Sequence, residues 1–202
     1  IDSTHMYLVG YNDSTDWRIE KRTLATGALD ASFGSGGVIT SAATSEIAYS
    51  LAIDSTYLYV IGTEGGGPNW RIEKRLLSTG ALVAGFGSSG VVSSLGGEEA
   101  REIAVDSTFM YVVGYVNTGS DFDWRIEKRR LDTGALDAGF GSGGVVTSAA
   151  GYRALSVSID PTSMYVTGDD NSNPPPSDWR IEKRRLDTGA LDTAFGTSGV
   201  VT

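Results

Sequence analysis

Residues 124–129 read WRIEKR, and the same six letters recur at three other places in the chain, beginning at Trp17, Trp70 and Trp179. Successive copies are separated by 53, 54 and 55 residues. The stretch 123–137 also recurs without a change as 178–192, so recent duplication is the simplest explanation. A fixed period of this length is the mark of a repeat protein, and each copy is expected to adopt one local structure.

Four strand-like segments, separated by turn residues, can be read in each repeat. The first alternates apolar with small residues and is expected at 47–53, 100–105 and 154–159. The second follows an Asp-Ser-Thr or Asp-Pro-Thr turn, in which the Asp accepts downstream backbone N–H bonds, and carries Tyr7, Tyr59, Tyr111 or Tyr165. The third is the WRIEKR segment. The fourth follows a Phe-Gly pair and begins at Val38, Val91, Val145 or Val200.

These segments predict an all-β fold, because four-stranded sheets repeated at a period near fifty are typical of a β-propeller. We expect one domain over 1–202, with blade repeats of about 53 residues at approximately 1–46, 47–98, 99–152 and 153–202. The chain opens at Ile1, just after a first strand should have ended, so the first blade lacks that strand. The prediction is therefore a four-bladed propeller or part of a larger one, and a chain that is a fragment of a longer protein.

Alternation along the third strand places its Trp, Ile and Lys on one face and its Arg, Glu and Arg on the other. Two interpretations of the charged face stay open. It meets the next blade as a ladder of charges, or it is a solvated surface, as charge runs usually are.

Composition limits the class of partner. The 202 residues carry a net charge of −9, which repels nucleic acid and anionic membrane surfaces. No stretch approaches the roughly eighteen apolar residues of a membrane span, so no membrane insertion is expected. The 27 glycines and 5 prolines favour many short strands joined by tight turns, and the lack of cysteine excludes disulfides and thiolate chemistry.

The segment Leu131–Val146, LDTGALDAGFGSGGVV, resembles the delta-60 type propeller repeats of bacterial and archaeal surface proteins. The resemblance rests on a Leu-Asp, Phe-Gly, Gly-Val cadence and extends over all four repeats, although the WRIEKR strand departs from the commoner pattern. It implies a secreted or cell-surface protein, and it implies little about biochemical activity.

Motifs with catalytic potential are few. Asp-Thr-Gly at Asp132 and Asp187 looks like the Leu-Asp-Thr-Gly-Ala of retropepsin-like aspartic proteases, in which two carboxylates share a proton. The matching positions in the other repeats are Ala25 and Ser78. Equivalent turns of adjacent blades would lie roughly 10 Å or more apart, which is too far for two carboxylates to share a proton. The single histidine, His5, leaves a zinc site or a catalytic triad with too few members.

Three acidic clusters could supply oxygen ligands to Ca²⁺: Glu98-Glu99, Asp121/Asp123 and Asp169-Asp170-Asn171. None follows an EF-hand or nonapeptide spacing. We therefore expect no cofactor and keep Ca²⁺ as the lesser alternative.

Comparing the repeats with one another locates the candidate contact surface. The Trp-to-Phe spacing is 16 residues in every repeat, whereas the Tyr-to-Trp spacing is 10, 11, 13 or 14. The loops that enter the first strands also vary, and alternating hairpins place both variable sets on one rim. Specificity commonly resides in loops on a rigid scaffold, so this variable rim is the predicted binding surface, with Glu98, Glu99, Tyr152, Asp169 and Asp170 as its contributors.

The leading functional hypothesis is a non-catalytic extracellular module for binding, adhesion or structural assembly. Its predicted partners are a protein or glycan at the variable rim, and other copies or missing repeats through self-assembly. The alternative is a carbohydrate-active hydrolase or lyase with a site at the propeller centre. For that alternative Glu102 is the candidate residue, because it stands where the other repeats have Ser50 and Ser156.

Overall fold

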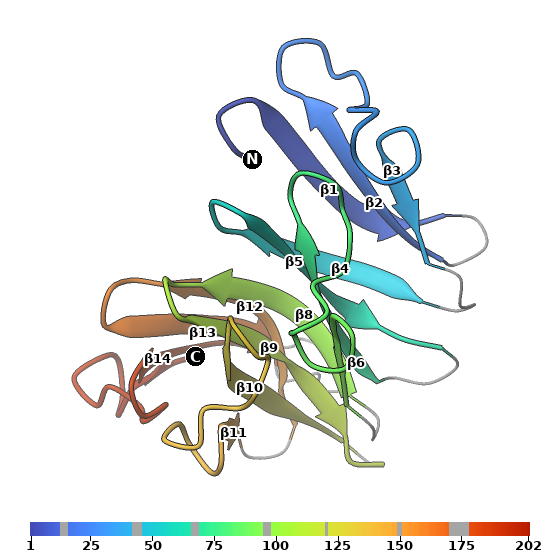
Figure 1. Cartoon of the computed structure of the whole chain (residues 1–202). Helices are drawn as coiled ribbons and strands as arrows, with labels where there is room; N and C mark the ends of the chain where they lie inside the picture. The colour runs from blue at the N-terminus through green and yellow to red at the C-terminus, as the bar shows by residue number, and fades with distance from the viewer. Residues whose placement is uncertain are drawn as a thin grey trace. The chain divides into compact units, whose positions relative to one another are not determined.

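The computed structural model describes eight segments of the chain: residues 1–12, 16–41, 46–65, 69–94, 98–119, 121–148, 151–169 and 178–202. These residues form strands and turns and contain no helix. They divide into two compact units, 1–95 and 96–202, each with two antiparallel sheets (Figure 1).

Unit 1 begins with a three-stranded sheet of β1 (His5–Tyr11), β2 (Trp17–Thr23) and β3 (Val38–Thr40), in that order. Its second sheet has four strands, β4 (Ile47–Ile53), β5 (Tyr57–Thr63), β6 (Trp70–Leu76) and β7 (Val91–Ser93).

Unit 2 contains two four-stranded sheets, each again in chain order. The third sheet of the chain has β8 (Glu98–Val105), β9 (Phe109–Asn117), β10 (Phe122–Arg130) and β11 (Val145–Thr147). The fourth has β12 (Arg153–Ile159), β13 (Ser163–Asp169), β14 (Trp179–Arg185) and β15 (Val200–Val201).

The all-β prediction is confirmed, and within the described residues the first sheet has one strand fewer than the others, as expected. The fourth strands begin at the predicted valines. First strands begin earlier than predicted in unit 2, at Glu98 and Arg153, because the polar residues before Ala100 and Ala154 continue the ladder with β9 and β13.

A hydrogen-bonded turn repeats before every second strand, as the Asp-Ser-Thr pattern predicted. Asp106 Oδ1 accepts the backbone N–H groups of Thr108 and Phe109, at 2.7 Å each. Its Oδ2 accepts the Tyr111 hydroxyl at 2.8 Å. The same carboxylate-to-tyrosine bond forms in the other three repeats, at Asp2–Tyr7, Asp54–Tyr59 and Asp160–Tyr165. Each second strand is thus fixed to the turn that starts it.

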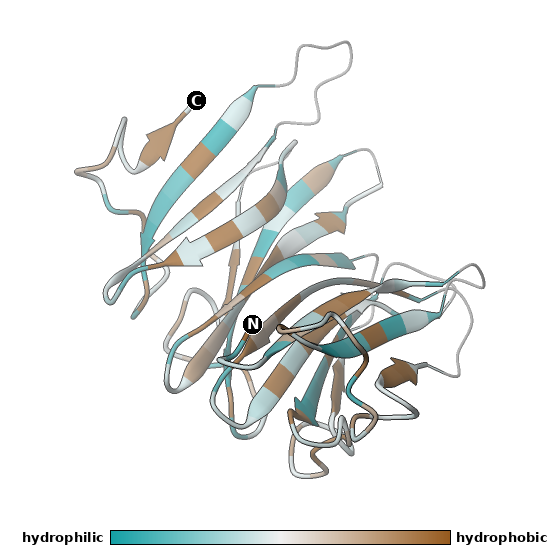
Figure 2. Cartoon of the chain, turned by 90° about the horizontal axis from the view of Figure 1, so that it is seen from above, coloured by the Kyte–Doolittle hydropathy of each residue, from teal (hydrophilic) through white to brown (hydrophobic). Residues whose placement is uncertain are grey.

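Hydrophobic and hydrophilic residues alternate along the strands (Figure 2), and in unit 1 two sheets bury facing sides against each other. The first sheet contributes what we call its Trp face, Tyr7, Trp17, Ile19 and Phe33. The second contributes its Arg face, Ala48, Leu58, Val60 and Leu77 together with Arg71. Leu58 and Val60 lie opposite the charged residues of β6 in the ladder, so they share a face with Arg71.

Unit 2 repeats this interface at matching positions. The Trp face of the third sheet carries Tyr111, Trp124, Ile126 and Phe140, and the Arg face of the fourth carries Ala154, Met164, Val166 and Leu186. The turn after β14 also reaches back to the third sheet, where Gly141 N–H donates to the Thr188 carbonyl at 2.9 Å. Gly34 and Thr79 make the same bond in unit 1, also at 2.9 Å.

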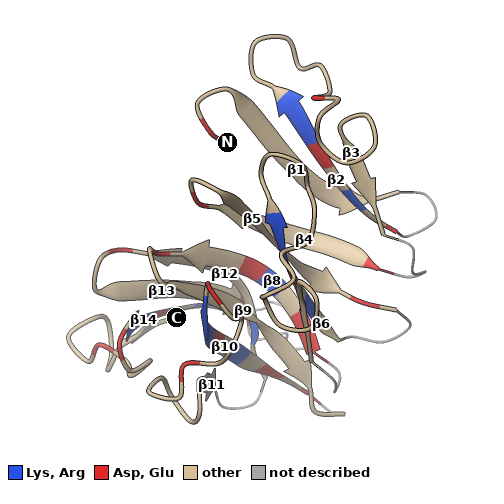
Figure 3. Cartoon of the chain, in the orientation of Figure 1, with Lys and Arg blue, Asp and Glu red and all other residues tan. Residues whose placement is uncertain are grey.

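The Arg-Glu-Arg face of the second and of the fourth sheet is therefore not a solvated surface. In unit 2, Glu182 is fully buried and is bound by Arg180 and Arg184, at 2.6 and 2.7 Å. Figure 3 shows the same positive, negative, positive succession along β2. The ladder interpretation holds within each unit, with the preceding sheet as the neighbour rather than the next one: the guanidinium of Arg71 lies 5.6 Å from the centre of the Trp17 ring.

Replacing Glu182 by Gln should destabilise unit 2 by about 3–5 kcal/mol, because the largely buried guanidinium groups of Arg180 and Arg184 lose their counter-charge. Urea unfolding followed by circular dichroism measures this loss. The matched control is Glu20→Gln, because the Glu20 side chain is 13% exposed and its arginines Arg18 and Arg22 are 40% and 33% exposed. Its effect should be clearly smaller, and equal midpoints for Glu182→Gln and the unmodified protein would contradict the buried ladder.

Candidate functional site

One edge of unit 2 gathers four of the five residues predicted to bind a partner. Glu98 and Glu99 begin β8, Tyr152 directly precedes β12, and Asp169 ends β13. Antiparallel order places the start of a first strand beside the end of a second strand, so all four lie on the rim formed by the variable loops. The fifth, Asp170, lies outside the described residues.

Glu99 and Asp169 are held in charged hydrogen bonds. The Tyr115 hydroxyl donates to Glu99 Oε2 at 2.7 Å, and Arg101 donates to the same oxygen at 3.2 Å. Arg153 binds Asp169 through both carboxylate oxygens, at 2.9 and 2.7 Å. The hydrogen bond from Arg153 to Asp169 raises the pKa of Arg153, against a desolvation effect that lowers it, and Tyr115 and Glu99 add to the increase. Each of the two sheets thus contributes one charged, hydrogen-bonded group to the rim, and we call the two groups together the rim network.

Glu98 and Tyr152 occupy the same repeat position, and both approach the first arginine of their own sheet's WRIEKR strand. Glu98 is buried, and its Oε1 pairs with Arg125 at 3.1 Å. The Tyr152 ring lies 4.8 Å from the guanidinium carbon of Arg180. These two residues support the rim from inside, whereas Glu99 and Asp169 keep side-chain exposures of 27% and 22%.

Glu102 lies at a β-bulge in β8, where the pairing with β9 shifts between Ala100 and Glu102. Matching bulges follow Ala48 and Ala154. Gly114 lies opposite the bulge, and a Cβ there would collide with the Glu99 carbonyl. The local structure at Glu102 is thus the one that serines occupy in the other repeats.

Acidic residues do not gather into an evident metal site in the part of the chain that the structure describes, where no group of three or more His, Asp or Glu side chains could hold an ion. Of the predicted calcium ligands, Glu98 and Asp169 are engaged by arginines, and Asp121 accepts the N–H of Phe122 at 2.9 Å. Asp170 and Asn171 fall outside the described residues.

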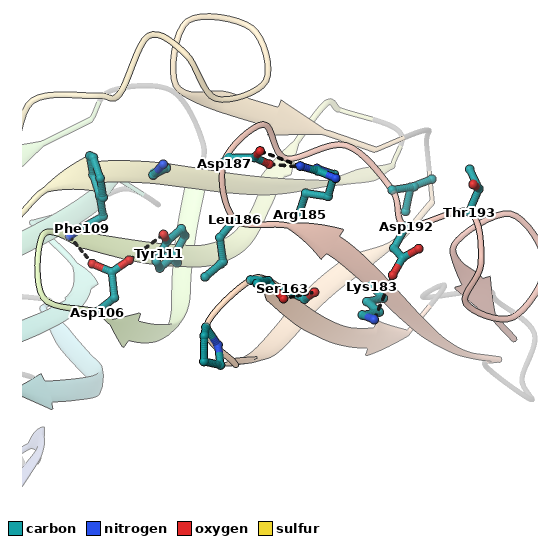
Figure 4. A pocket seen from close by; sticks show the side chains of 14 residues that line it. Asp106, Phe109, Tyr111, Ser163, Lys183, Arg185, Leu186, Asp187, Asp192 and Thr193 are labelled. Atoms are coloured by element: carbon teal, nitrogen blue, oxygen red, sulfur yellow. Dashed lines mark hydrogen bonds and ion pairs between the residues drawn. The ribbon is translucent and has the colours of Figure 1, made fainter.

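The opposite rim of unit 2 holds a cavity of about 690 Å³ that the sequence did not indicate (Figure 4). It is formed by turns that have the same length in every repeat, so a comparison of loop lengths among the repeats could not indicate it. Its charged side chains are paired with one another or with neighbours: Arg185 with Asp187 at 2.8 Å, Lys183 with Asp192 at 2.9 Å. Leu186, Leu191 and Pro161 provide its apolar lining, so it suits a polar ligand with a small apolar part.

The two Asp-Thr-Gly aspartates have separate arginine partners. Arg130 binds both oxygens of Asp132, and Arg185 binds both oxygens of Asp187, at 3.0 and 2.8 Å in each case. The hydrogen bonds from these arginines lower the pKa of each carboxyl to about 2. Each carboxylate is therefore stabilised in its ionised form by its own cation.

Comparison with known protein-family models and with curated proteins yields no match to this sequence. Among the described residues, no helix has the length and apolar character needed to cross a membrane.

The pairing of Asp187 predicts how it titrates. Because its folded pKa lies below the ordinary value of 3.8, its contribution to stability is complete above about pH 4 and is lost as the pH falls towards 2. In Arg185→Ala the pKa of Asp187 should rise towards 3.8, which carboxyl-carbon NMR titration measures. Arg130→Ala is the control and should raise the pKa of Asp132 alone. An unchanged Asp187 titration in Arg185→Ala would refute the pairing.

Proposed function

We propose that the four sheets are blades of a β-propeller, four-bladed or part of a larger one, in a single repeat domain. The module is non-catalytic, and it binds a protein or glycan at the variable rim outside the cell. The resemblance of its repeats to propeller repeats of surface proteins supports the secreted or cell-surface location.

The interface between successive sheets is the main support for the propeller. Units 1 and 2 independently pack a Trp face against an Arg face with matching residues and the same glycine-to-threonine bond. Because the same packing of one sheet on the next occurs in both units, we expect it between the second and third sheets as well. Face-to-face packing of antiparallel sheets at a constant relation is how propeller blades are arranged.

The observation that carries the binding proposal is the rim network of Glu99, Tyr115, Arg153 and Asp169. It combines two carboxylates and two cations, counting Arg101, whose side chains are all partly exposed at strand ends, with the buried ring of Tyr115. Such groups can form hydrogen bonds with sugar hydroxyls or with the polar rim of a protein interface. The neighbouring loops differ among repeats, so the constant scaffold presents a different surface at each blade.

Crosslinking can test the repeated blade packing. The chain has no cysteine, so cysteines introduced in pairs react with a short bismaleimide without background. The test pair is Ser88→Cys with Thr133→Cys. The matched control, Ser142→Cys with Thr188→Cys, flanks the observed bond between Gly141 and Thr188. We expect both pairs to crosslink within one chain with similar yield on denaturing gels. Crosslinking of the control pair alone would contradict propeller packing between the second and third sheets.

Binding at the rim can be tested with labelled protein on a glycan array and on intact bacterial and animal cells. Glu99→Gln and Asp169→Asn should each weaken binding by about 10-fold or more, because each removes a charged hydrogen-bonding group. Asp187→Asn on the opposite rim is the control and should bind like the unmodified protein. Absence of binding to every surface, or equal losses in all three variants, would refute the rim as the binding site.

A further inference from the structure

The interface that forms twice inside the chain leaves a bare Trp face on the fourth sheet. Trp179 is 78% exposed, whereas Trp17 and Trp124, at the same repeat position, are 1% and 0% exposed. Val201 on the same face is 40% exposed. An exposed indole beside further apolar side chains, on a face that is buried in the other repeats, is a surface built for contact.

The first sheet has the complementary bare surface, an Arg face. Leu8 is 42% exposed, whereas Val60 and Val166 at the same repeat position are 0% exposed. Leu24 is 41% exposed, whereas its equivalents Leu77 and Leu186 are 9% and 8% exposed.

The charged and turn residues of the first sheet show the same difference. The Arg18 side chain is 40% exposed, twice the 20% of Arg71 and of Arg180, both of which lie over a tryptophan. A Cβ added to Gly27 would meet nothing within 4 Å, whereas one added to Gly80 would collide with Ile39 of the preceding sheet.

A groove of about 560 Å³ lies on the bare Arg face, lined by Ser3, Thr4, His5, Thr23, Leu24 and Ala25. The same repeat positions of the fourth sheet line part of the unit 2 cavity, where the third sheet supplies Asp106, Phe109, Tyr111 and Lys128. The groove therefore corresponds to the half of the unit 2 cavity that the fourth sheet supplies. In unit 2 the third sheet, which precedes it, supplies the other half.

We propose that the Trp face of the fourth sheet binds the Arg face of the first sheet in a second copy of this chain. Trp179 of one copy lies under Arg18 of the other, and Leu24 packs where Leu77 and Leu186 pack in the internal interfaces. The Thr26 carbonyl accepts the Gly196 N–H, as Thr79 accepts from Gly34 and Thr188 from Gly141.

A second copy is the proposed occupant because each copy carries both halves of the interface. Closure of the two faces within one chain, as in a four-bladed ring, is the outcome in which the protein stays monomeric with Trp179 protected. The two halves differ, so the contact is head-to-tail and leads either to closed rings, of which a reciprocal pair of copies is the smallest, or to open chains. The proposal concerns different residues from Glu99 on the variable rim, so the two ideas can fail separately.

Sedimentation velocity over a concentration series tests the proposal. The unmodified protein should form oligomers that increase with concentration. Trp179→Ala and Leu24→Glu should each weaken association by roughly 30-fold or more, as loss of a central interface residue does. Both side chains are exposed in the isolated chain, so both variants should fold.

Mixing the two variants gives a sharper result. Trp179→Ala keeps its Arg face and Leu24→Glu keeps its Trp face, so the mixture can form one intact interface and should give a 1:1 heterodimer that grows no further. Asp132→Asn is the control, because this exposed residue of the third sheet belongs to neither face, and it should associate like the unmodified protein.

Acrylamide quenching provides an independent measurement, since Trp179 is the one exposed tryptophan among the four. Its quenching should decrease as oligomers form. The proposal is overturned if the protein stays monomeric at all concentrations, whether acrylamide quenches Trp179 or not. It is also overturned if Trp179→Ala associates as strongly as the unmodified protein, or if the mixed variants stay monomeric.

Discussion

The packing of a Trp face on an Arg face is the interaction on which the rest of this structure depends. Burying an Arg-Glu-Arg row costs a large desolvation free energy unless each charge finds a close partner. Here the glutamate accepts hydrogen bonds from both arginines, as Glu182 does from Arg180 and Arg184. The second arginine also donates to a turn carbonyl, from Arg184 to Gly189 at 2.7 Å. In the internal interfaces the first arginine lies against the indole of the preceding sheet, where a cation is attracted to the ring.

This interface explains why one half of the repeat has a fixed length. Between the Trp and the fourth-strand Val, the chain must place an arginine, a threonine carbonyl and a close-packed glycine against the neighbouring sheet. Gly189 has a positive φ and lies so close to Phe140 and Val146 that a Cβ would collide with Val146. An insertion there would displace all three groups, whereas an insertion in the loop after a second strand displaces none of them. Variation is therefore confined to the rim that these loops form.

Much of the fold was predictable because its signals are local. Turn chemistry and alternation located the strands, and Asp106 with Tyr111 shows how a short pattern fixes a turn. The early starts of β8 and β12, the bulge at Glu102 and the inward direction of Glu98 were not predictable, since each depends on cross-strand pairing. The unit 2 cavity was missed for a related reason: it arises where constant turns of two sheets meet, and constancy within a repeat resembles a purely structural requirement.

The position before the first strand shows how the rim and the interface are coupled. Glu46 and Glu98 approach Arg71 and Arg125 there, at 4.0 and 3.1 Å, and in both one carboxylate oxygen is buried without a hydrogen-bond partner. Such an oxygen carries a desolvation cost. Tyr152 interacts with Arg180 through its ring and buries no ionised group. Because the arginine is also part of the interface between sheets, a substitution at this rim position changes the stability of the packing as well as the surface available to a partner. Rim residues that contact the arginine are thus constrained by the fold, and those directed away from it, such as Glu99, are free to change with the partner.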